Sequence, residues 1–267
     1  MKKILFIGAG RMATAIAGGL VGKSYNADDI AAFDINEFAC QKFMEATSIC
    51  AVSENIEKYL EQADVVFLAV KPQFLAGAVG QISDLLQSKL IISIVAGVSI
   101  EKLEKLCTSN RIIRVMPNTP ALVGKGCSGF TVSENITEEE ENFAKFILDS
   151  VGISFKLPEK LMDAVTALSG SGPAYVFEFA DALAEGGMTC GIPMELSLEM
   201  AIATLEGAAA MLKETKVHPS ILKDQVTSPG GTTLRALQVL EARDFRNTIV
   251  KAVEGACERS KELGRDA

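Results

Sequence analysis

Two glycine-bearing segments, one near each end of the 267-residue chain, carry the residue types best suited to binding and chemistry. The first, Gly8-Ala9-Gly10-Arg11-Met12-Ala13, follows an apolar run and opens an apolar helical segment, Met12–Leu20. In a G-x-G-x-x-A pattern the glycines allow a tight turn and close approach of a pyrophosphate, and the alanine allows close helix–strand packing. The helix N-terminus adds free N–H groups. The pattern predicts a dinucleotide site; the alternative is a glycine turn in an α/β domain that binds nothing.

Asp34 ends a predicted strand near the position where an acidic residue accepts hydrogen bonds from the adenosine ribose. An acidic side chain there disfavours a 2′-phosphate, and the chain continues Ile35-Asn36-Glu37 without an arginine. NADH is therefore slightly better supported than NADPH. Two alternatives stay open: Asp34 caps the following helix, or Arg11 meets a phosphate.

Two further segments are expected at the ends of buried strands. Ala69-Val70-Lys71-Pro72-Gln73 closes one strand, and Ala96-Gly97 closes the next. Ligands of open α/β sheets bind beyond the carboxyl ends of the strands, so both segments are predicted to face the nicotinamide half of the cofactor. Taken alone, Lys71 is better explained as a solvated residue at the start of a helix.

The second glycine-bearing segment is Thr227-Ser228-Pro229-Gly230-Gly231-Thr232-Thr233, which precedes an apolar helical run, Leu234–Leu240. Glycines at a helix N-terminus expose N–H groups suited to a small carboxylate, and the hydroxyls of Ser228 and Thr233 lie beside them. A helix–helix turn with capping residues is the simpler explanation from chemistry alone. A hydroxyl-lined carboxylate site fits imine reduction, because an iminium already carries its charge and needs chiefly a positioned hydride.

The elements that must position these residues alternate between short apolar strands and helical segments as far as Pro158. Continuously apolar strands suit a parallel sheet that helices cover on both faces. Residues 1–158 are therefore predicted to form a Rossmann-type, doubly wound α/β domain. The predicted strands are Lys3–Ile7, Ile30–Asp34, Asp64–Val70, Lys89–Val95, Arg111–Met116, Gly129–Ser133 and Ile153–Leu157.

Residues 159–267 are predicted to form an all-helical C-terminal domain for dimerisation and substrate binding. Within Met194–Lys213, the charged residues Glu199, Glu206 and Lys213 follow at seven-residue spacing and form one narrow polar stripe. Such a helix is buried nearly all round, and a domain of this size cannot surround it alone, so we expect a homodimer. The helices are expected to break at Gly170-Ser171-Gly172-Pro173, Gly191-Ile192-Pro193, His218-Pro219 and Pro229-Gly230-Gly231.

Composition limits the possible partners. Hydrophobic residues make up 48% of the chain and charged residues 22%, which is typical of a globular protein. The formal net charge of −8 repels phosphate backbones and anionic lipid, so we expect a small-molecule partner, with no nucleic acid and no membrane. Six separated cysteines without a C-x-x-C pair are expected to be buried thiols in a reducing compartment, which favours the cytoplasm. The one histidine, His218, precedes a proline, so neither a histidine relay nor a metal site is expected.

Taken together, these motifs resemble the pyrroline-5-carboxylate reductase family over nearly the whole chain. The resemblance rests on Ile7-Gly8-Ala9-Gly10 with Met12-Ala13, Phe67-Leu68-Ala69-Val70-Lys71-Pro72, Arg114-Val115-Met116-Pro117-Asn118-Thr119-Pro120, Leu168-Ser169-Gly170-Ser171-Gly172-Pro173-Ala174-Tyr175 and Val226-Thr227-Ser228-Pro229-Gly230-Gly231-Thr232-Thr233. The last two of these motifs are highly specific in combination.

The resemblance implies an enzyme that uses NADPH or NADH to reduce 1-pyrroline-5-carboxylate to L-proline, with active sites at subunit interfaces and dimers often assembled into rings. It implies that Gly8 to Ala13 hold the pyrophosphate, that Asp34 and Asn55 lie near the adenosine ribose, and that Ala69 to Pro72 line the nicotinamide ribose. Many relatives carry Ser, Asn or Arg around the position of Asp34 and favour NADPH, so the cofactor preference stays open.

For the substrate, the resemblance implies that Gly230 and Gly231 bind the carboxylate through their N–H groups. Thr233 and Ser228 are the candidate catalytic residues: Thr233 would hydrogen-bond the ring nitrogen and relay its proton, and Ser228 would shape the loop. A larger or thiazoline-type cyclic imine remains an alternative substrate. The rival families are β-hydroxyacid dehydrogenases, which rely on a catalytic lysine, and redox-sensing regulators, which carry a basic partner-binding segment; neither feature stands out here.

Overall fold

The computed structural model describes residues 1–266. Contacts divide the chain into two units: Met1–Ser171 together with the residues from Ala256 onward, and Gly172–Gly255. Because these units are defined by contacts alone, the division expected at residue 158 remains a prediction. Each unit is described by itself.

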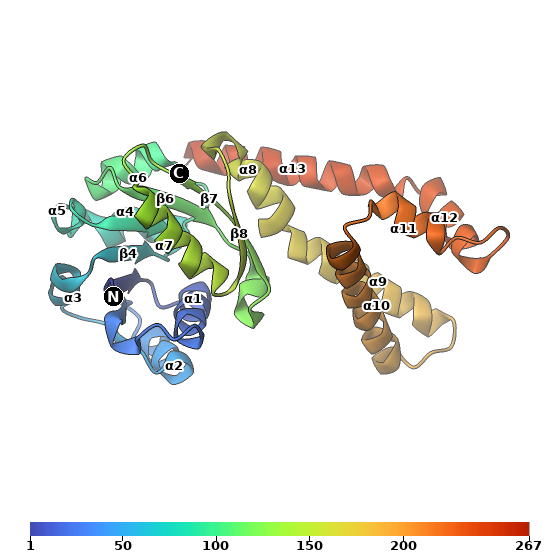
Figure 1. Ribbon diagram of the computed structural model, residues 1–267, viewed down its shortest axis with the longest axis horizontal. Coiled ribbons are helices and arrows are strands. Elements are labelled where there is room, and N and C mark those ends of the chain that lie inside the picture. The colour runs from blue at the N-terminus through green and yellow to red at the C-terminus, as the bar shows by residue number, and fades with distance from the viewer. Residues whose placement is uncertain (267) are drawn as a thin grey trace. The chain divides into compact units, whose positions relative to one another are not determined.

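The first unit is built on one eight-stranded sheet with the order β3-β2-β1-β4-β5-β6-β7-β8 (Figure 1). The first six strands in this order are mutually parallel, β7 runs antiparallel to β6, and β8 is parallel to β7. This is a doubly wound, Rossmann-type sheet with an added edge pair, and it confirms the predicted fold class. The strands are β1 (Ile4–Ile7), β2 (Ile30–Phe33), β3 (Cys50–Val52), β4 (Val65–Leu68), β5 (Leu90–Ser93), β6 (Ile112–Met116), β7 (Gly126–Val132) and β8 (Gly152–Lys156).

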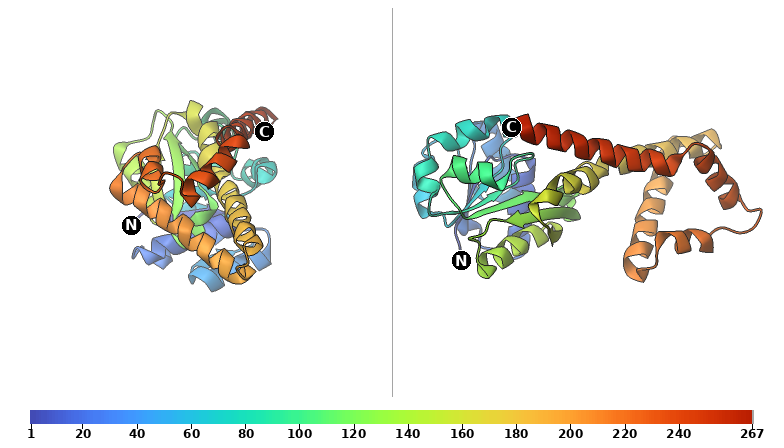
Figure 2. Two further views of the ribbon diagram at one scale, coloured as in Figure 1. Left: turned by 90° about the vertical axis from the view of Figure 1, so that its right-hand side faces the viewer. Right: turned by 90° about the horizontal axis from the view of Figure 1, so that it is seen from above.

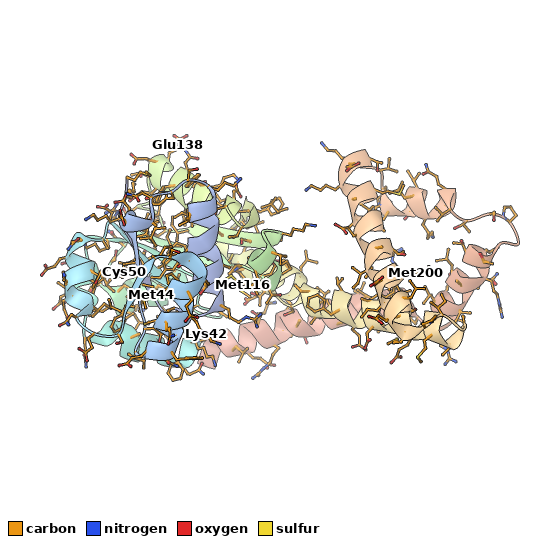
Figure 3. All side chains as sticks on the ribbon, turned by 90° about the horizontal axis from the view of Figure 1, so that it is seen from below. Lys42, Met44, Cys50, Met116, Glu138 and Met200 are labelled. Carbon is orange, nitrogen blue, oxygen red and sulfur yellow. The ribbon has the colours of Figure 1, made fainter. Side chains whose placement is uncertain are left out.

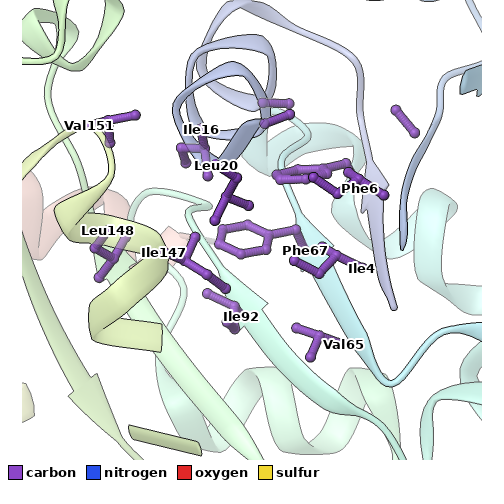
Figure 4. Packing of buried hydrophobic residues seen from close by; sticks show 14 of the residues in the cluster. Ile4, Phe6, Ile16, Leu20, Val65, Phe67, Ile92, Ile147, Leu148 and Val151 are labelled. Carbon is purple, nitrogen blue, oxygen red and sulfur yellow. The ribbon is translucent and has the colours of Figure 1, made fainter. Parts of the chain in front are cut away.

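Helices cover both faces of this sheet, and strand residues alternate between the two cores. Phe6 on β1 and Phe67 on β4 point to the same side, where their rings stack with centroids 4.8 Å apart. Ile16 of α1 and Ile147 of α7 close over them (Figure 4). The core on the other face is closed by α3, α4, α5 and α6. The covering helices are α1 (Arg11–Gly22), α2 (Glu37–Thr47), α3 (Ile56–Gln62), α4 (Pro72–Gly80), α5 (Ser83–Leu86), α6 (Ile100–Cys107) and α7 (Glu138–Asp149).

The helix break expected at Gly170-Ser171-Gly172-Pro173 is present only as a one-residue interruption. Helix α8 (Met162–Val165) continues as a π-helix (η4, Thr166–Gly170), Ser171 follows with an αR backbone, and α9 begins at the next residue (Gly172–Thr189). The N–H of Ser171 donates to the carbonyl of Thr166 at 2.8 Å, which is the bond that closes the wider π turn. The Asn118 amide, two residues after the end of β6, also donates to the carbonyl of Ser169 at 3.0 Å and ties the loop after β6 to the π segment.

The second unit contains helices only: α9, α10 (Met194–Thr215), α11 (Pro219–Gln225), α12 (Thr232–Ala242) and the start of α13 (Phe245–Asp266). The α9–α10 hairpin is pinned by the buried Ser197 hydroxyl, which donates to the carbonyl of Ala184 at 2.7 Å. Among the described residues, no helix is both long and apolar enough to cross a bilayer.

Helix α10 is not covered all round within one chain. Met200 projects from it and is 52% exposed, and Ile202 is 53% exposed (Figure 3). Only Ser197 and Ala201 of this helix are buried. The expected burial therefore depends on a surface that a single chain does not supply.

Candidate functional site: a cleft at the carboxyl ends of the strands

A cavity of about 620 Å³ lies where the strand order reverses, at the carboxyl ends of β1, β2 and β4. This is the position at which open α/β sheets bind ligands. Six of the predicted cofactor residues line it: Gly8, Gly10, Asp34, Ala69, Val70 and Lys71. The other lining residues are Ile7, Phe33, Ile35, Asn36, Ala39, Gln73, Phe74, Gly77 and Ala78.

Gly8 and Gly10 have different reasons to be glycine. Gly8 has a φ of 105°, and a Cβ added to it would lie 2.6 Å from the carbonyl oxygen of Ala69. Gly10 has an ordinary φ of −75°, and a Cβ added there would meet nothing within 4 Å. Gly8 therefore allows β1 and β4 to end side by side, whereas Gly10 leaves open space on the cavity side.

The N-terminus of α1 faces this space without a side-chain cap. Its first-turn N–H groups belong to Arg11, Met12 and Ala13, and such groups have no partner within the helix itself. The Ala13 side chain is fully buried beneath the strands, Met12 packs against the same core, and Arg11 is exposed. Backbone donors and the positive dipole end thus suit an anion such as a pyrophosphate.

Asp34 joins the glycine turn to the next helix. One carboxylate oxygen accepts the Ala9 N–H at 2.9 Å, and the other accepts the Asn36 N–H at 2.9 Å. Asn36 itself caps α2 by accepting the N–H groups of Phe38 and Ala39. The alternative in which Asp34 caps α2 is therefore wrong, because Asn36 fills that position. The Ala9 N–H is directed at Asp34 and not at the space where a phosphate would bind.

Beneath Asp34, Cys40 forms part of the support for the cleft. Its thiol lies 3.3 Å from the carbonyl oxygens of both Asp34 and Val52. Burial raises the pKa of Cys40, against the opposing effect of the hydrogen bond to the Asp34 carbonyl. The group therefore remains a neutral thiol at physiological pH and acts as a donor that fixes the end of β2.

Helix α4 supplies the opposite wall, of which the sequence predicted only Gln73, the last residue of the Ala69–Gln73 motif. Lys71 is the exposed N-cap residue of α4 and also lines the cavity, so it is both a solvated residue at a helix start and part of the cavity wall. Gln73, Phe74, Gly77 and Ala78 follow at i, i+1, i+4 and i+5, which places them on one helix face. The helical spacing of these residues after Lys71-Pro72 is the signal in the sequence from which this wall could have been predicted. Phe74 is 59% exposed.

Other predicted cofactor residues do not line the cavity. Asn55 is the exposed N-cap of α3, in the left-handed conformation with φ 56°. Pro72 is the first residue of α4. Ala96 and Gly97 follow β5, and the backbone of Gly97 lies against that of Gly264 in α13. Asn55 and Ala96-Gly97 thus follow strands of the same sheet without belonging to the cavity wall.

In the second unit, the segment 227–233 forms a tight turn into α12. Gly230 has a φ of 69°, and the Gly231 N–H donates to the carbonyl of Ser228 at 3.0 Å. Gly231 is the N-cap of α12 and provides no side-chain cap, so the first-turn donors are those of Thr232, Thr233 and Leu234. The Thr233 side chain is partly exposed beside them. Anion-binding donors are present, but the Gly231 N–H closes the turn and is not among them.

Among residues 1–266, no group of three or more His, Cys, Asp or Glu side chains is arranged to hold a metal ion. His218 has a structural role: its Nδ1 accepts the N–H of Ser220 at 3.3 Å and caps α11.

Comparisons with known proteins identify relatives over nearly the full length. The family model described as pyrroline-5-carboxylate reductase dimerisation matches residues 159–263, and the model described as NADP oxidoreductase, coenzyme F420-dependent, matches residues 3–97. A pyrroline-5-carboxylate reductase from Arabidopsis thaliana is 40% identical over 264 residues, which cover 98% of this chain and 96% of the relative.

Solved structures agree with these matches. A pyrroline-5-carboxylate reductase from Coxiella burnetii superposes with a TM-score of 0.91 at 34% identity, covering 98% of both chains. The Plasmodium falciparum pyrroline carboxylate reductase, crystallised with NADP bound, superposes with a TM-score of 0.89 at 34% identity, again covering 98% of both chains.

Proposed function

The chain belongs to the pyrroline-5-carboxylate reductase family, and on this premise we propose that it reduces 1-pyrroline-5-carboxylate to L-proline with NAD(P)H, the last step of proline biosynthesis. The observation that carries the proposal is the match over nearly the whole chain, combined with a cleft at the strand-order reversal that suits a dinucleotide. The expected division into residues 1–158 and 159–267, the ring of dimers and the cytoplasmic location remain parts of this proposal.

The cleft fits a nicotinamide dinucleotide on two observations. The space next to Gly10 is open, and no side chain caps the first-turn N–H groups of α1 that face it. In the proposal, the segment from Gly8 to Ala13 holds the pyrophosphate, Asp34 and Asn55 lie toward the adenosine ribose, and Ala69 to Pro72 with Ala96-Gly97 lie toward the nicotinamide half. The bound cofactor supplies the hydride.

The chain's own contribution to the reaction is mainly binding and orientation. The N-terminus of α12, with Gly230 and Gly231 shaping its entrance and Ser228 closing the turn, binds the substrate carboxylate. The Thr233 hydroxyl hydrogen-bonds the ring nitrogen and relays a proton to it. Thr233 is therefore the catalytic residue of the proposal.

A matched pair of threonines tests this role. Replacing Thr233 by Ala is expected to lower kcat on the order of 10²-fold, because a positioned proton donor is lost. Cofactor affinity should stay within about twofold of that of the unmodified protein, since the glycine turn of the first unit is untouched. Thr232→Ala, one residue earlier in the same helix turn, serves as the control and should retain most activity. Equal turnover in the two variants would remove the assigned role.

Asp34 decides the cofactor preference in the proposal. Its carboxylate is held by two backbone N–H groups, so its negative charge is fixed beside the cleft and disfavours a 2′-phosphate. We expect NADH to bind at least as tightly as NADPH. In Asp34→Asn the ratio of the two dissociation constants should move about tenfold toward NADPH, equivalent to about 1.4 kcal/mol. The ratio of the two dissociation constants is measured because a general loosening of the loop would weaken NADH and NADPH binding equally and leave the ratio unchanged. An unchanged ratio would contradict the role of Asp34.

A further inference from the structure

The last turns of α13 belong to the first unit and pack on the turn that follows β5 (Figure 2). Gly97, in that turn, has a φ of 77°, and a Cβ added to it would lie 3.7 Å from the backbone nitrogen of Gly264. A Cβ added to Gly264 would lie 3.2 Å from the carbonyl oxygen of Gly97, closer than an ordinary van der Waals contact. The two glycines thus allow a backbone-to-backbone approach between segments far apart in sequence.

A buried hydrogen bond anchors this end of α13. The Ser260 hydroxyl donates to a carboxylate oxygen of Asp163, on α8, at 2.7 Å, and Ser260 is only 6% exposed. Ser260 and Gly264 are four residues apart, so both lie on the face of α13 that meets the first unit.

The far end of the same turn is fixed separately. One carboxylate oxygen of Glu159 accepts a hydrogen bond from the N–H of Ile100 at 2.8 Å and another from Nη1 of Arg114 at 3.0 Å. Arg114 is buried in β6, so Glu159 is held in place by the sheet. The Ser99 hydroxyl meanwhile accepts the N–H of Lys102 and caps α6. The segment between Val95 and Ile100 is therefore held at its end by Glu159 and in its middle by Gly264.

We propose that the last turns of α13, through Gly264 and Ser260, are a positioning element for the Ala96-Gly97 turn and thereby for the nicotinamide half of the cofactor. This inference rests on the proposed function, in which that turn meets the nicotinamide. Misplacement of a reacting group by about 1 Å can cost a reaction 10²-fold, so support of this turn controls the rate. Gly10 and Asp34, which the proposal assigns to the pyrophosphate and the adenosine ribose, line a cavity to which neither Ala96 nor Gly97 contributes, so the adenosine half is independent of this support.

Ligands that occupy different parts of the site test the inference. Gly264→Val places two methyl groups against the Gly97 carbonyl. The matched control is Gly80→Val, at the exposed end of α4, where an added Cβ meets nothing within 4 Å. For Gly264→Val we expect ADP, which carries only the adenosine half, to bind within about twofold of the unmodified protein. NADH and NADPH should bind about fivefold or more weakly, and kcat should fall about tenfold. Gly80→Val should change none of these.

A second variant tests the inference in case Gly264→Val does not fold. Ser260→Ala removes the bond to Asp163 and should weaken NADH and NADPH binding in the same direction, by a smaller factor, with ADP binding retained. Unchanged NADH and NADPH binding in a folded Gly264→Val, or in Ser260→Ala if the first variant is unfolded, would overturn the inference. If the unmodified protein fails to reduce pyrroline-5-carboxylate while the binding differences hold, the proposed function fails and the positioning role stands.

Discussion

Gly8 and Gly10 stand two residues apart in one motif, yet different forces require them. At Gly8 the requirement comes from the protein itself, through a left-handed backbone and the carbonyl of Ala69. At Gly10 the protein places nothing within 4 Å of an added Cβ, so in the proposed function the requirement comes from the bound dinucleotide. On that proposal one position is a matter of folding and the other a matter of binding.

Alanine substitutions separate these two requirements. Gly8→Ala should lower the free energy of unfolding by about 1–3 kcal/mol, because the new Cβ collides with backbone and the φ is unfavourable. Gly10→Ala should change stability by less than about 1 kcal/mol but weaken dinucleotide binding about tenfold. Urea unfolding and titration with NADH or NADPH measure the two effects. A Gly10→Ala protein with unaltered dinucleotide affinity would contradict the assignment.

Sequence reasoning identified the cleft residues that follow strands, because the glycine motif and the end of a buried strand leave local signals. Gly8, Gly10, Asp34 and Lys71 all line the cavity. It missed Phe74, Gly77 and Ala78 of the α4 wall, since helix orientation about its own axis depends on tertiary packing. It also missed that the Asp34 carboxylate binds the Ala9 N–H, because such a bond depends on coordinates that no spacing rule contains.

Helix α7 depends on a single carboxylate at its start. Glu140 is 3% exposed, accepts the Thr137 N–H at 2.9 Å and completes a capping box. It also pairs with the Arg111 guanidinium, which approaches from the start of β6. Burial raises the pKa of Glu140, but the bonds from Thr137 and Arg111 outweigh it and hold the pKa below its ordinary value. The charged form of Glu140 therefore stabilises the fold.

This arrangement gives a pH-dependent contribution with a definite sign. A carboxyl whose folded pKa is lowered stabilises the protein above its unfolded pKa, and the contribution is lost as the pH falls through the lowered folded value. Glu140→Gln should lower the free energy of unfolding by about 1–3 kcal/mol at pH 7. The difference should shrink as the pH drops below the ordinary glutamate range. Urea unfolding across pH checks this; a difference that persists at the lowest pH would contradict it.

Among the elements, β3 and the π-helix were not predicted. β3 has three residues, Cys50–Val52, too few for a recognisable alternation, and it exists because β2 offers a parallel edge. The π-helix ends at Gly170, where the segment Gly170-Ser171-Gly172-Pro173 predicts a turn, but the Asn118 amide and the bond between Ser171 and Thr166 hold it helical. Long-range bonds outweighed local propensity in both cases.

At the scale of the whole molecule, the helices of the second unit expose more apolar side chains than a free surface of this kind normally carries. The family model for dimerisation matches this part of the chain, and the exposed residues of α10 include Leu198, Met200 and Ile202. We expect a second copy of the chain to cover them in a homodimer. The narrow polar stripe of α10 predicted an apolar helix that must be covered. The sequence does not identify the surface that covers it, because in a homodimer that surface belongs to a second copy.

Two leucines of nearly equal exposure allow a controlled test of this interface. Leu198 on α10 is 39% exposed, and Leu85 on α5 is 37% exposed. Leu198→Glu should raise the dissociation constant of the dimer at least about tenfold, because a charge is buried without a partner. Leu85→Glu should leave the dimer intact. Sedimentation measured over a range of concentrations distinguishes them, and equal behaviour of the two variants would place the interface elsewhere.

The first unit is completed by two stretches of chain, with the entire second unit inserted between them. During synthesis the ribosome therefore delivers the residues of the sheet early, whereas the last turns of α13, with Ser260 and Gly264, emerge only after all of Gly172–Gly255. If these turns position the Ala96-Gly97 turn as proposed, the nicotinamide side of the site is completed last. A bulky fusion placed directly after α13 would then disturb the turns that complete it.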